Sequence, residues 1–236
     1  QNIINSFQHI KYMGTAADKW NAPFYKNYLE IFKDPKMLIA LKNTGIMIIA
    51  TIVGEVGLAI VLSLLVSNIK KGAGFFRVVY FFPIVISATA LGLLFNLVFL
   101  YDKGMINQLL QLIGVLDAGK NKLIDWKATY PMFTMLVPVI WQYVGFYFII
   151  LLTGLSGIPE DLYEAAEIDG ASKLQQVRYV TLPLLRNSIC TCVVLAVTGA
   201  LKVFDLPWTM FVNGMSNTWL TGTYMYSKVY VDVDYS

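Results

Sequence analysis

The residues best suited to bind another molecule lie in one polar stretch, Gly154 to Leu185, between two strongly apolar segments. Within it, Leu162, Ala165 and Ala166 share one narrow face of a predicted helix, because they are spaced by three and four positions. Alanine side chains are small enough to let the backbone of another protein approach closely. These residue types therefore offer recognition of a protein surface rather than catalysis. The alternative is an ordinary amphipathic surface hairpin.

The same stretch predicts a compact knob made of two short helices. Pro159 suits the first position of the first helix, and Gly170 can take the left-handed conformation that stops it. Ser172 and Gln175 have the spacing of a capping box that opens a second helix, and Pro183 is expected to limit that helix. The predicted order is helix, sharp glycine turn, helix.

Residue combinations typical of catalysis or metal binding are scarce. His9 is the only histidine, which disfavours most histidine-based catalysis and metal chemistry. Cys190 and Cys192 are two positions apart in an apolar run and would point to different faces of a helix, so they predict neither a disulfide framework nor a zinc site. The sequence has no Gly-x-x-x-x-Gly-Lys-Ser/Thr phosphate loop, so we expect no ATPase activity in this chain. No cofactor and no metal are predicted.

The composition is typical of a membrane protein. Hydrophobic residues make up 57% of the chain and charged residues only 14%, with a mean hydropathy of +0.60. Soluble domains carry about 25% charged residues, so this chain lies far outside that class. The net charge of +3 is small and scattered, and no nucleic-acid partner is expected.

Four segments are apolar enough, and long enough, to cross a membrane as helices, since about 20 residues span a hydrocarbon core of ~30 Å. They run roughly over Thr44–Ser67, Val78–Leu100, Tyr130–Thr153 and Arg186–Leu206. Pro83 is expected to kink the second. The polar connection over 101–129 contains an amphipathic stretch whose apolar face comprises Ile106, Leu109, Leu110 and Ile113. Because a helix in lipid satisfies its own backbone hydrogen bonds, the predicted fold is all-α and transmembrane.

The knob sequence resembles the signature of the membrane subunits of bacterial binding-protein-dependent ABC importers. Glu164-Ala165-Ala166 is followed by Gly170, four residues after the second alanine, and then by Val180-x-Leu182-Pro183, in which only Val180 departs from the usual isoleucine. Further similarity to carbohydrate-type permeases, and to the maltose-type first permease, covers nearly the whole chain. Its segments are Phe24 to Asn43, Gly74-Phe75-Phe76-Arg77, Phe81-Phe82-Pro83, Gly104-Met105-Ile106-Asn107 and Leu201-Lys202-Val203-Phe204-Asp205.

This resemblance implies a type I ABC importer permease core, which has six helices and both ends in the cytoplasm. The chain would show helices two to five, plus cytoplasmic coupling helices. Residues 1–43 would be an extracellular segment, 44–206 the transmembrane core with its coupling loop over 154–185, and 207–236 a second extracellular segment. One further membrane helix is expected beyond each end.

Basic residues alone do not decide the orientation of the chain. The hairpin over 68–77 carries three of them and the connection over 101–129 carries four. The three arginines all fall on the side of the coupling loop. If that loop meets a cytosolic ATPase, this side is the cytoplasm.

The function implied by the resemblance is that of a permease subunit in an ATP-driven importer of oligosaccharide-type sugars, in the bacterial cell membrane. Its partners would be a second, similar permease subunit in a heterodimer, two ATPase subunits, an extracellular sugar-binding protein and membrane lipid. By motif match, the residues implied for coupling to the ATPase are Glu164 as a polar anchor, Ala165 and Ala166 as the packed face, Gly170 as the turn, and Leu182 with Pro183.

Glu55 and a polar-aromatic patch in the third span are the candidates for the sugar pathway. A charge in mid-span costs roughly 2.5–3.5 kcal/mol, so Glu55 is expected to face the bundle interior, as a pathway residue or as a partnered or protonated group that fixes helix packing. Tyr143 and Tyr147 share a helix face and offer a sugar both stacking surface and hydroxyl groups. Gln142 competes with them as the alternative, Trp141 points elsewhere, and ordinary helix packing would also explain the patch.

Lys202 and Asp205, three apart within a family-like motif, are expected to form a structural ion pair near the outer end of the last span rather than to contact sugar.

Two other function classes fit the residues less well. A secondary, ion-coupled transporter should show repeats, broken helices and intramembrane ion ligands, which one glutamate and one Lys/Asp pair do not supply. A membrane-embedded enzyme would need a catalytic constellation, and the spans hold no cluster of histidine, cysteine or carboxylate residues.

Overall fold

The computed structural model describes residues 2–9, 19–69, 72–116 and 123–231 of the 236-residue chain. The chain divides into two compact units. The first unit comprises residues 1–46, 95–134 and 201–236, and the second comprises residues 47–94 and 135–200. Apart from one short strand pairing in the first unit, the described residues form helices and their connections, which confirms the predicted all-α fold.

Helices suited to crossing a membrane occur at all four predicted places. Within the described residues three qualify individually, and a bent pair brings the number to four if it counts as one span. The spans are α3 (Pro35–Thr51) continued by η1 (Ile52–Gly57) and α4 (Leu58–Ser67); the bent pair α5 (Ala73–Val85) and α6 (Ala88–Val98); α9 (Pro131–Ser156); and α13 (Arg186–Lys202) followed by α14 (Asp205–Met210).

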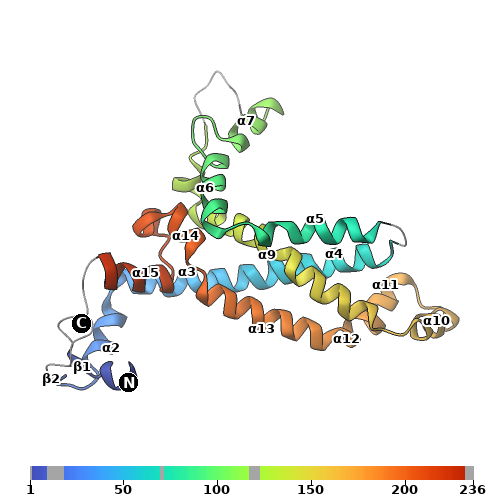
Figure 1. The fold of residues 1–236 in the computed structure, drawn as a ribbon, viewed down its shortest axis with the longest axis horizontal. Helices are drawn as coiled ribbons and strands as arrows, with labels where there is room; N and C mark the ends of the chain where they lie inside the picture. The colour runs from blue at the N-terminus through green and yellow to red at the C-terminus, as the bar shows by residue number, and fades with distance from the viewer. Residues whose placement is uncertain (1, 10–18, 70–71, 117–122, 232–236) are drawn as a thin grey trace. The chain divides into compact units, whose positions relative to one another are not determined.

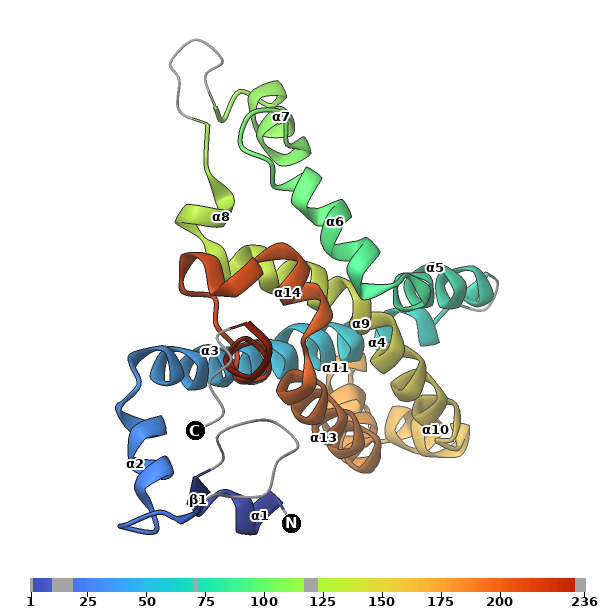
Figure 2. The ribbon, with the colours of Figure 1, turned by 60° about the vertical axis from the view of Figure 1, so that its left-hand side comes forward.

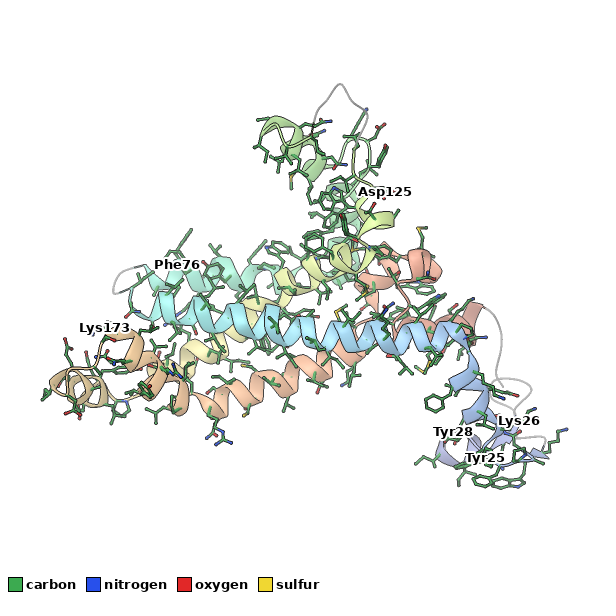
Figure 3. The ribbon with its side chains drawn as sticks, turned by 180° about the vertical axis from the view of Figure 1, so that it is seen from behind. Tyr25, Lys26, Tyr28, Phe76, Asp125 and Lys173 are labelled. Carbon is green, nitrogen blue, oxygen red and sulfur yellow. The ribbon has the colours of Figure 1, made fainter. Side chains whose placement is uncertain are left out.

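The other described elements are short. In the first unit they are α1 (Asn2–Asn5), the antiparallel pair β1 (Gln8–His9) and β2 (Lys19–Trp20), α2 (Lys26–Lys33), α7 (Met105–Leu112), α8 (Trp126–Thr129), η3 (Val212–Asn217), α15 (Thr221–Tyr226) and η4 (Ser227–Val231). In the second unit they are α10 (Glu160–Ile168), α11 (Lys173–Gln176), η2 (Val177–Thr181) and α12 (Leu182–Leu184). Figure 3 shows Lys26 and Tyr28 on α2 and Asp125 at the start of α8.

The first membrane helix begins at Pro35 rather than at the predicted Thr44. Asp34 Oδ1 accepts a hydrogen bond from the Lys36 amide at 2.8 Å, and Pro35, which has no amide hydrogen, takes the first helical position. Hydrophobicity marks only the part of a helix that lies in hydrocarbon. The apolar segment that begins at Thr44 therefore marks the membrane span, and the helix itself starts earlier, at Asp34-Pro35, where the sequence allows a helix to start.

Asp34 also joins the start of α3 to α15 and η4 within the first unit. The Tyr224 hydroxyl donates a hydrogen bond to Asp34, and Lys228 Nζ lies 3.9 Å from the same carboxylate. Desolvation raises the pKa of the Asp34 carboxyl, but these two groups and backbone hydrogen bonds outweigh it and lower that pKa. Further along α3, Asn43 Nδ2 donates to the Trp219 carbonyl at 3.0 Å, so segments far apart in sequence are tied together.

Asn107 on α7 holds α7 to the segment that leads into α8. Its side chain is buried and makes three hydrogen bonds of 2.9 Å. Nδ2 donates to the carbonyls of Tyr101 and Ile124, and Oδ1 accepts from the Trp126 indole N–H. Every hydrogen-bonding atom of this amide side chain thus has a partner.

The amphipathic stretch predicted in this connection is the helix α7. Its apolar face is not covered by the described part of the chain, because Leu109 is 52% exposed and Ile113, which follows the helix, is 67% exposed.

In the second unit α4, α5, α9 and α13 run together lengthwise, with α10 and α11 beyond one end (Figures 1 and 2). The core between them includes the fully buried Ala59, Phe148, Leu151 and Cys192. A Cβ atom at Gly145 of α9 would overlap the Tyr80 carbonyl oxygen of α5. Glycine at this position lets the two backbones touch, which is how helices pack most closely in membranes.

The second predicted span is two helices rather than one kinked helix. α5 and α6 meet at an angle of 96°. The break lies at Ile86, whose backbone is extended (φ −73°, ψ 133°), and Pro83 stays within the last turn of α5. Pro83 has no amide hydrogen to donate to the preceding turn, and its ring crowds the carbonyl there, so it weakens the end of α5, which stops at Val85.

The ion pair expected between Lys202 and Asp205 does not form. Lys202 is the last residue of α13 and Asp205 the first of α14, with two non-helical residues between them. The spacing of three places side chains side by side only on a continuous helix. Among the described residues, no ion pair involves either of them.

We predict that Asn107→Ala lowers the stability of the chain by about 2–3 kcal/mol, because it leaves the Trp126 indole N–H and the carbonyls of Tyr101 and Ile124 without this partner. Thermal unfolding in detergent would measure the loss. Gln108→Ala, which alters an exposed side chain on the same helix, is the control and should leave the midpoint nearly unchanged. Equal midpoints for both variants would contradict the role of Asn107.

Candidate functional site

The first half of the predicted knob is the helix α10. Pro159 precedes the helix as its cap residue, one position before the predicted place, and Glu160 and Asp161 form its acidic first turn. The helix ends at Gly170, whose φ of 77° is left-handed, as predicted. The Ala171 amide then donates to the Ala166 carbonyl at 2.9 Å, which closes the turn.

The capping box that opens the second half is present. The Ser172 amide donates to Gln175 Oε1 at 2.7 Å, and the Gln175 amide donates to Ser172 Oγ at 3.4 Å. The prediction that Pro183 limits this helix is wrong. Helical structure continues through α11, η2 and α12, and only Leu185 separates it from α13.

The π-helical turn η2 explains how the helix passes Pro183. At its end the Leu182 amide donates to the Val177 carbonyl, five residues back rather than four. Pro183 follows directly, in the first turn of α12, where a missing amide hydrogen is tolerated. The sequence offered no sign of this change in hydrogen-bond register.

The residues implied for recognition lie on the surface of the knob. Glu164, Ala165, Gly170 and Pro183 are exposed, and Ala166 and Leu182 are half-buried. Figure 1 shows α10 and α11 beyond the ends of α9 and α12. The knob thus projects from the rest of the second unit.

Large apolar side chains on the knob are exposed as well. Ile168 is 86% exposed, Leu174 79% and Leu162 42%. Ile168 and Leu174 were not singled out from sequence, although apolar residues in an otherwise polar loop are a usable signal. The salt bridge between Lys173 (Figure 3) and Glu167, at 3.7 Å with both side chains exposed, adds little stability.

Glu55 faces the interior of the second unit, as predicted. It lies in the π-helical turn η1 and is only 2% exposed. Its carboxyl lies beside the hydroxyl of Tyr147 on α9, which is also buried. The structure thus brings together two residues that the sequence listed without pairing, and Cys192 of α13 lies in the same core.

The other residues of the polar-aromatic patch differ in their burial and in their contacts. Tyr143 is half-buried and packs against the same core as Tyr147. Gln142 is buried, and its Nε2 donates to the Ile86 carbonyl at 3.1 Å, at the break between α5 and α6. Trp141 is 42% exposed. Gln142 and the tyrosine pair therefore have different surroundings, as predicted.

Within the described part of the chain, the histidine, cysteine and carboxylate residues form no group of three that could hold a metal ion. Cys190 is exposed and Cys192 buried, and both are free thiols.

Comparison with known proteins gives a family match over most of the chain. The model of the family described as "Binding-protein-dependent transport system inner membrane component" matches residues 56–228. The probable ABC transporter permease protein YurN of Bacillus subtilis is 33% identical over 208 residues, which are 87% of this chain and 70% of YurN.

Two further relatives are named for the compounds they transport. The arabinooligosaccharides transport system permease protein AraP of Halalkalibacterium halodurans is 32% identical over 219 residues, covering 91% of this chain and 65% of AraP. The diacetylchitobiose uptake system permease protein NgcF of Streptomyces coelicolor is 30% identical over 205 residues, covering 83% of this chain and 58% of NgcF. The chain thus spans 58% to 70% of the length of these three relatives.

Among solved structures, the fold matches a bacterial ABC transporter involved in the import of the acidic polysaccharide alginate. The TM-score is 0.78 at 20% identity, covering 89% of this chain and 74% of that chain. At this identity the match establishes the fold.

We predict that Gln142→Leu destabilises the chain by about 1–3 kcal/mol, since it keeps the side-chain volume but leaves the Ile86 carbonyl unpaired. The measurement is thermal unfolding in detergent. Thr153→Val, which removes an exposed hydroxyl bonded to its own helix, is the control on α9. If Gln142→Leu unfolds at the wild-type temperature, the amide does not support the break.

Proposed function

Because the chain belongs to the family of binding-protein-dependent transport system inner membrane components, and is thus a multi-pass membrane permease subunit, we propose that it forms half of the translocation pathway of an ATP-driven sugar importer. The cargo is inferred from relatives named for arabinooligosaccharides, diacetylchitobiose and lactose. An oligosaccharide-type sugar is the class these names have in common.

The knob over 154–185 is proposed to couple this chain to an ATPase partner. The observation that carries this proposal is that the helix pair of the knob projects from the membrane helices of the second unit. It presents large apolar side chains that the described part of the chain leaves exposed. Exposed apolar surface of this kind marks a protein-binding site. Glu164 would be the polar anchor, Ala165 and Ala166 the packed face, and Gly170 the turn, with Leu182 and Pro183 leading into α13.

Coupling would work through the connections of the knob. α10 follows α9, and α12 leads into α13 with one residue between them. Closure of an ATPase dimer would move the knob as a rigid body and swing both membrane helices. The chain itself would hydrolyse no ATP.

The residue ranges that make up the first unit support the proposed orientation of the chain in the membrane. It collects residues 1–46, 95–134 and 201–236, and the segments expected outside the cell (1–43, 101–129 and 207–236) fall within these ranges. We propose that this unit is extracellular and receives the sugar from a binding protein. A second permease subunit, in a heterodimer, and two ATPase subunits would complete the importer.

The sugar pathway is proposed to include the tyrosine face of α9. Tyr143 and Tyr147 offer rings for stacking and hydroxyls for hydrogen bonds. Glu55, which lies beside Tyr147, would orient that hydroxyl. Gln142 stays the alternative pathway residue, although its amide already serves the Ile86 carbonyl.

For the knob, we predict that Glu164→Ala or Gly170→Val lowers sugar-stimulated ATP hydrolysis by the assembled importer about 5- to 150-fold, the usual range of coupling free energies. A Cβ at position 170 would meet nothing within 4 Å, so the valine acts only through the left-handed backbone. Gly170→Asn, which tolerates that backbone, and Glu160→Ala on the same helix are the controls. Wild-type stimulation in both test variants, with normal assembly, would argue against a coupling role.

For the pathway, we predict that Tyr143→Phe combined with Tyr147→Phe lowers kcat/KM of sugar uptake about tenfold, because two hydroxyl partners are lost while the rings stay in the core. Basal ATP hydrolysis and assembly should be retained. Tyr80→Phe, a half-buried tyrosine of α5, is the matched control. Unchanged uptake in the double variant would make the patch a packing feature.

A further inference from the structure

A side-chain hydrogen bond joins the two halves of the knob. The Tyr163 hydroxyl of α10 lies 3.1 Å from Oγ1 of Thr181, the last residue of η2. Thr181 is 2% exposed and Tyr163 is half-buried, so the bond is largely shielded from water. A shielded hydrogen bond has no competing solvent partner close by, which makes it a fixed connection.

The direction of this bond follows from its surroundings. Thr181 Oγ1 also lies 3.4 Å from the Gln176 carbonyl, which can only accept a hydrogen bond. A threonine hydroxyl has a single proton, so it donates that proton to Gln176 and accepts one from Tyr163. Separately, Nε2 of the buried Gln176 side chain donates to the Ala171 carbonyl at 3.4 Å. In the bond between the two halves of the knob, the Tyr163 hydroxyl is therefore the donor.

The residues that follow α12 pack closely against the end of α9. A Cβ atom at Gly154, near the end of α9, would lie 2.7 Å from Ser188 Oγ and 2.9 Å from Leu185 Cδ2. Leu185 is itself buried and follows α12 directly. The second half of the knob is thus packed tightly where α9 ends and α13 begins.

The first half has no comparable backbone support. α10 is connected to α11 through the exposed glycine turn at Gly170 and to α9 through the short segment before Pro159. The Lys173–Glu167 ion pair is exposed and contributes little. Of the side-chain bonds between the halves, the one from Tyr163 is the shielded one.

We propose that Tyr163 is a positioning residue for coupling: through Thr181 it locks α10 to η2, so that a displacement of α10 reaches α13 instead of being absorbed at the glycine turn. This inference rests on the proposed coupling function of the knob. It assigns a role to the side of α10 that faces η2, and this role is different from contact with a partner protein.

The test uses the complete importer, with its second permease subunit, ATPases and binding protein, in proteoliposomes. Tyr163→Phe removes only the donor, whereas Thr181→Val removes the acceptor together with the bond from Thr181 to the Gln176 carbonyl. Tyr163→Phe should lower the number of sugar molecules transported per ATP hydrolysed about fivefold, the change that one neutral hydrogen bond sustains, and Thr181→Val should lower it at least as much. The double variant should lose no more than Thr181→Val alone. A purely structural defect would reduce the amount of assembled importer and leave this ratio unchanged.

Two controls keep the result interpretable. Tyr179→Phe removes a hydroxyl from η2 itself, on a ring that is 68% exposed, and Thr181→Ser keeps the acceptor; both should retain the wild-type ratio. A wild-type ratio in Tyr163→Phe, or additive losses in the double variant, would overturn the role of Tyr163. If Glu164→Ala uncouples while Tyr163→Phe does not, only this inference fails. If neither uncouples, the proposed coupling function fails with it.

Discussion

Backbone amides and carbonyls in the hydrocarbon of a membrane have no water to bond with, so each departure from regular helix needs a partner within the protein. The break between α5 and α6 is such a departure, because an extended residue at Ile86 frees backbone groups. The buried Gln142 side chain supplies a donor to the Ile86 carbonyl. The 96° bend is therefore supported by a side chain of α9, a helix that would otherwise need no polar residue at that position.

The π-helical turns of the second unit follow the same rule. Each widens the helix and carries a buried polar side chain, Glu55 in η1 and Thr181 in η2. In both cases a tyrosine from another helix meets that side chain: Tyr147 lies beside Glu55, and the Tyr163 hydroxyl is hydrogen-bonded to Thr181. Turns of this type occur often at functional sites, where a local change of register is put to use. Here both are fixed by a neighbour rather than left free.

The features that sequence could predict are those set by local chemistry. Four apolar segments marked the membrane helices, Ser172 and Gln175 marked a cap, and Gly170 marked a left-handed turn, because each depends on residues close in the chain. The failures all depend on backbone register or on distant partners. Helical structure continues past Pro183 because a π-helical turn precedes it. Lys202 and Asp205 do not form the expected ion pair, because α13 ends at Lys202. The pairing of Glu55 with Tyr147 joins residues 92 positions apart, which one sequence without alignment does not reveal.

The two sides of the knob differ in a way that suits the transmission of force. Its outward side exposes Ile168, Leu174 and the alanine face, whereas its inward side is hydrogen-bonded and packed at Thr181 and Leu185. A recognition surface built on rigid support loses little conformational entropy when a partner binds. It also deforms little when that partner moves, because densely packed elements respond as units. Work done on the outer face of such a knob is then available to move α13 rather than to reshape the loop.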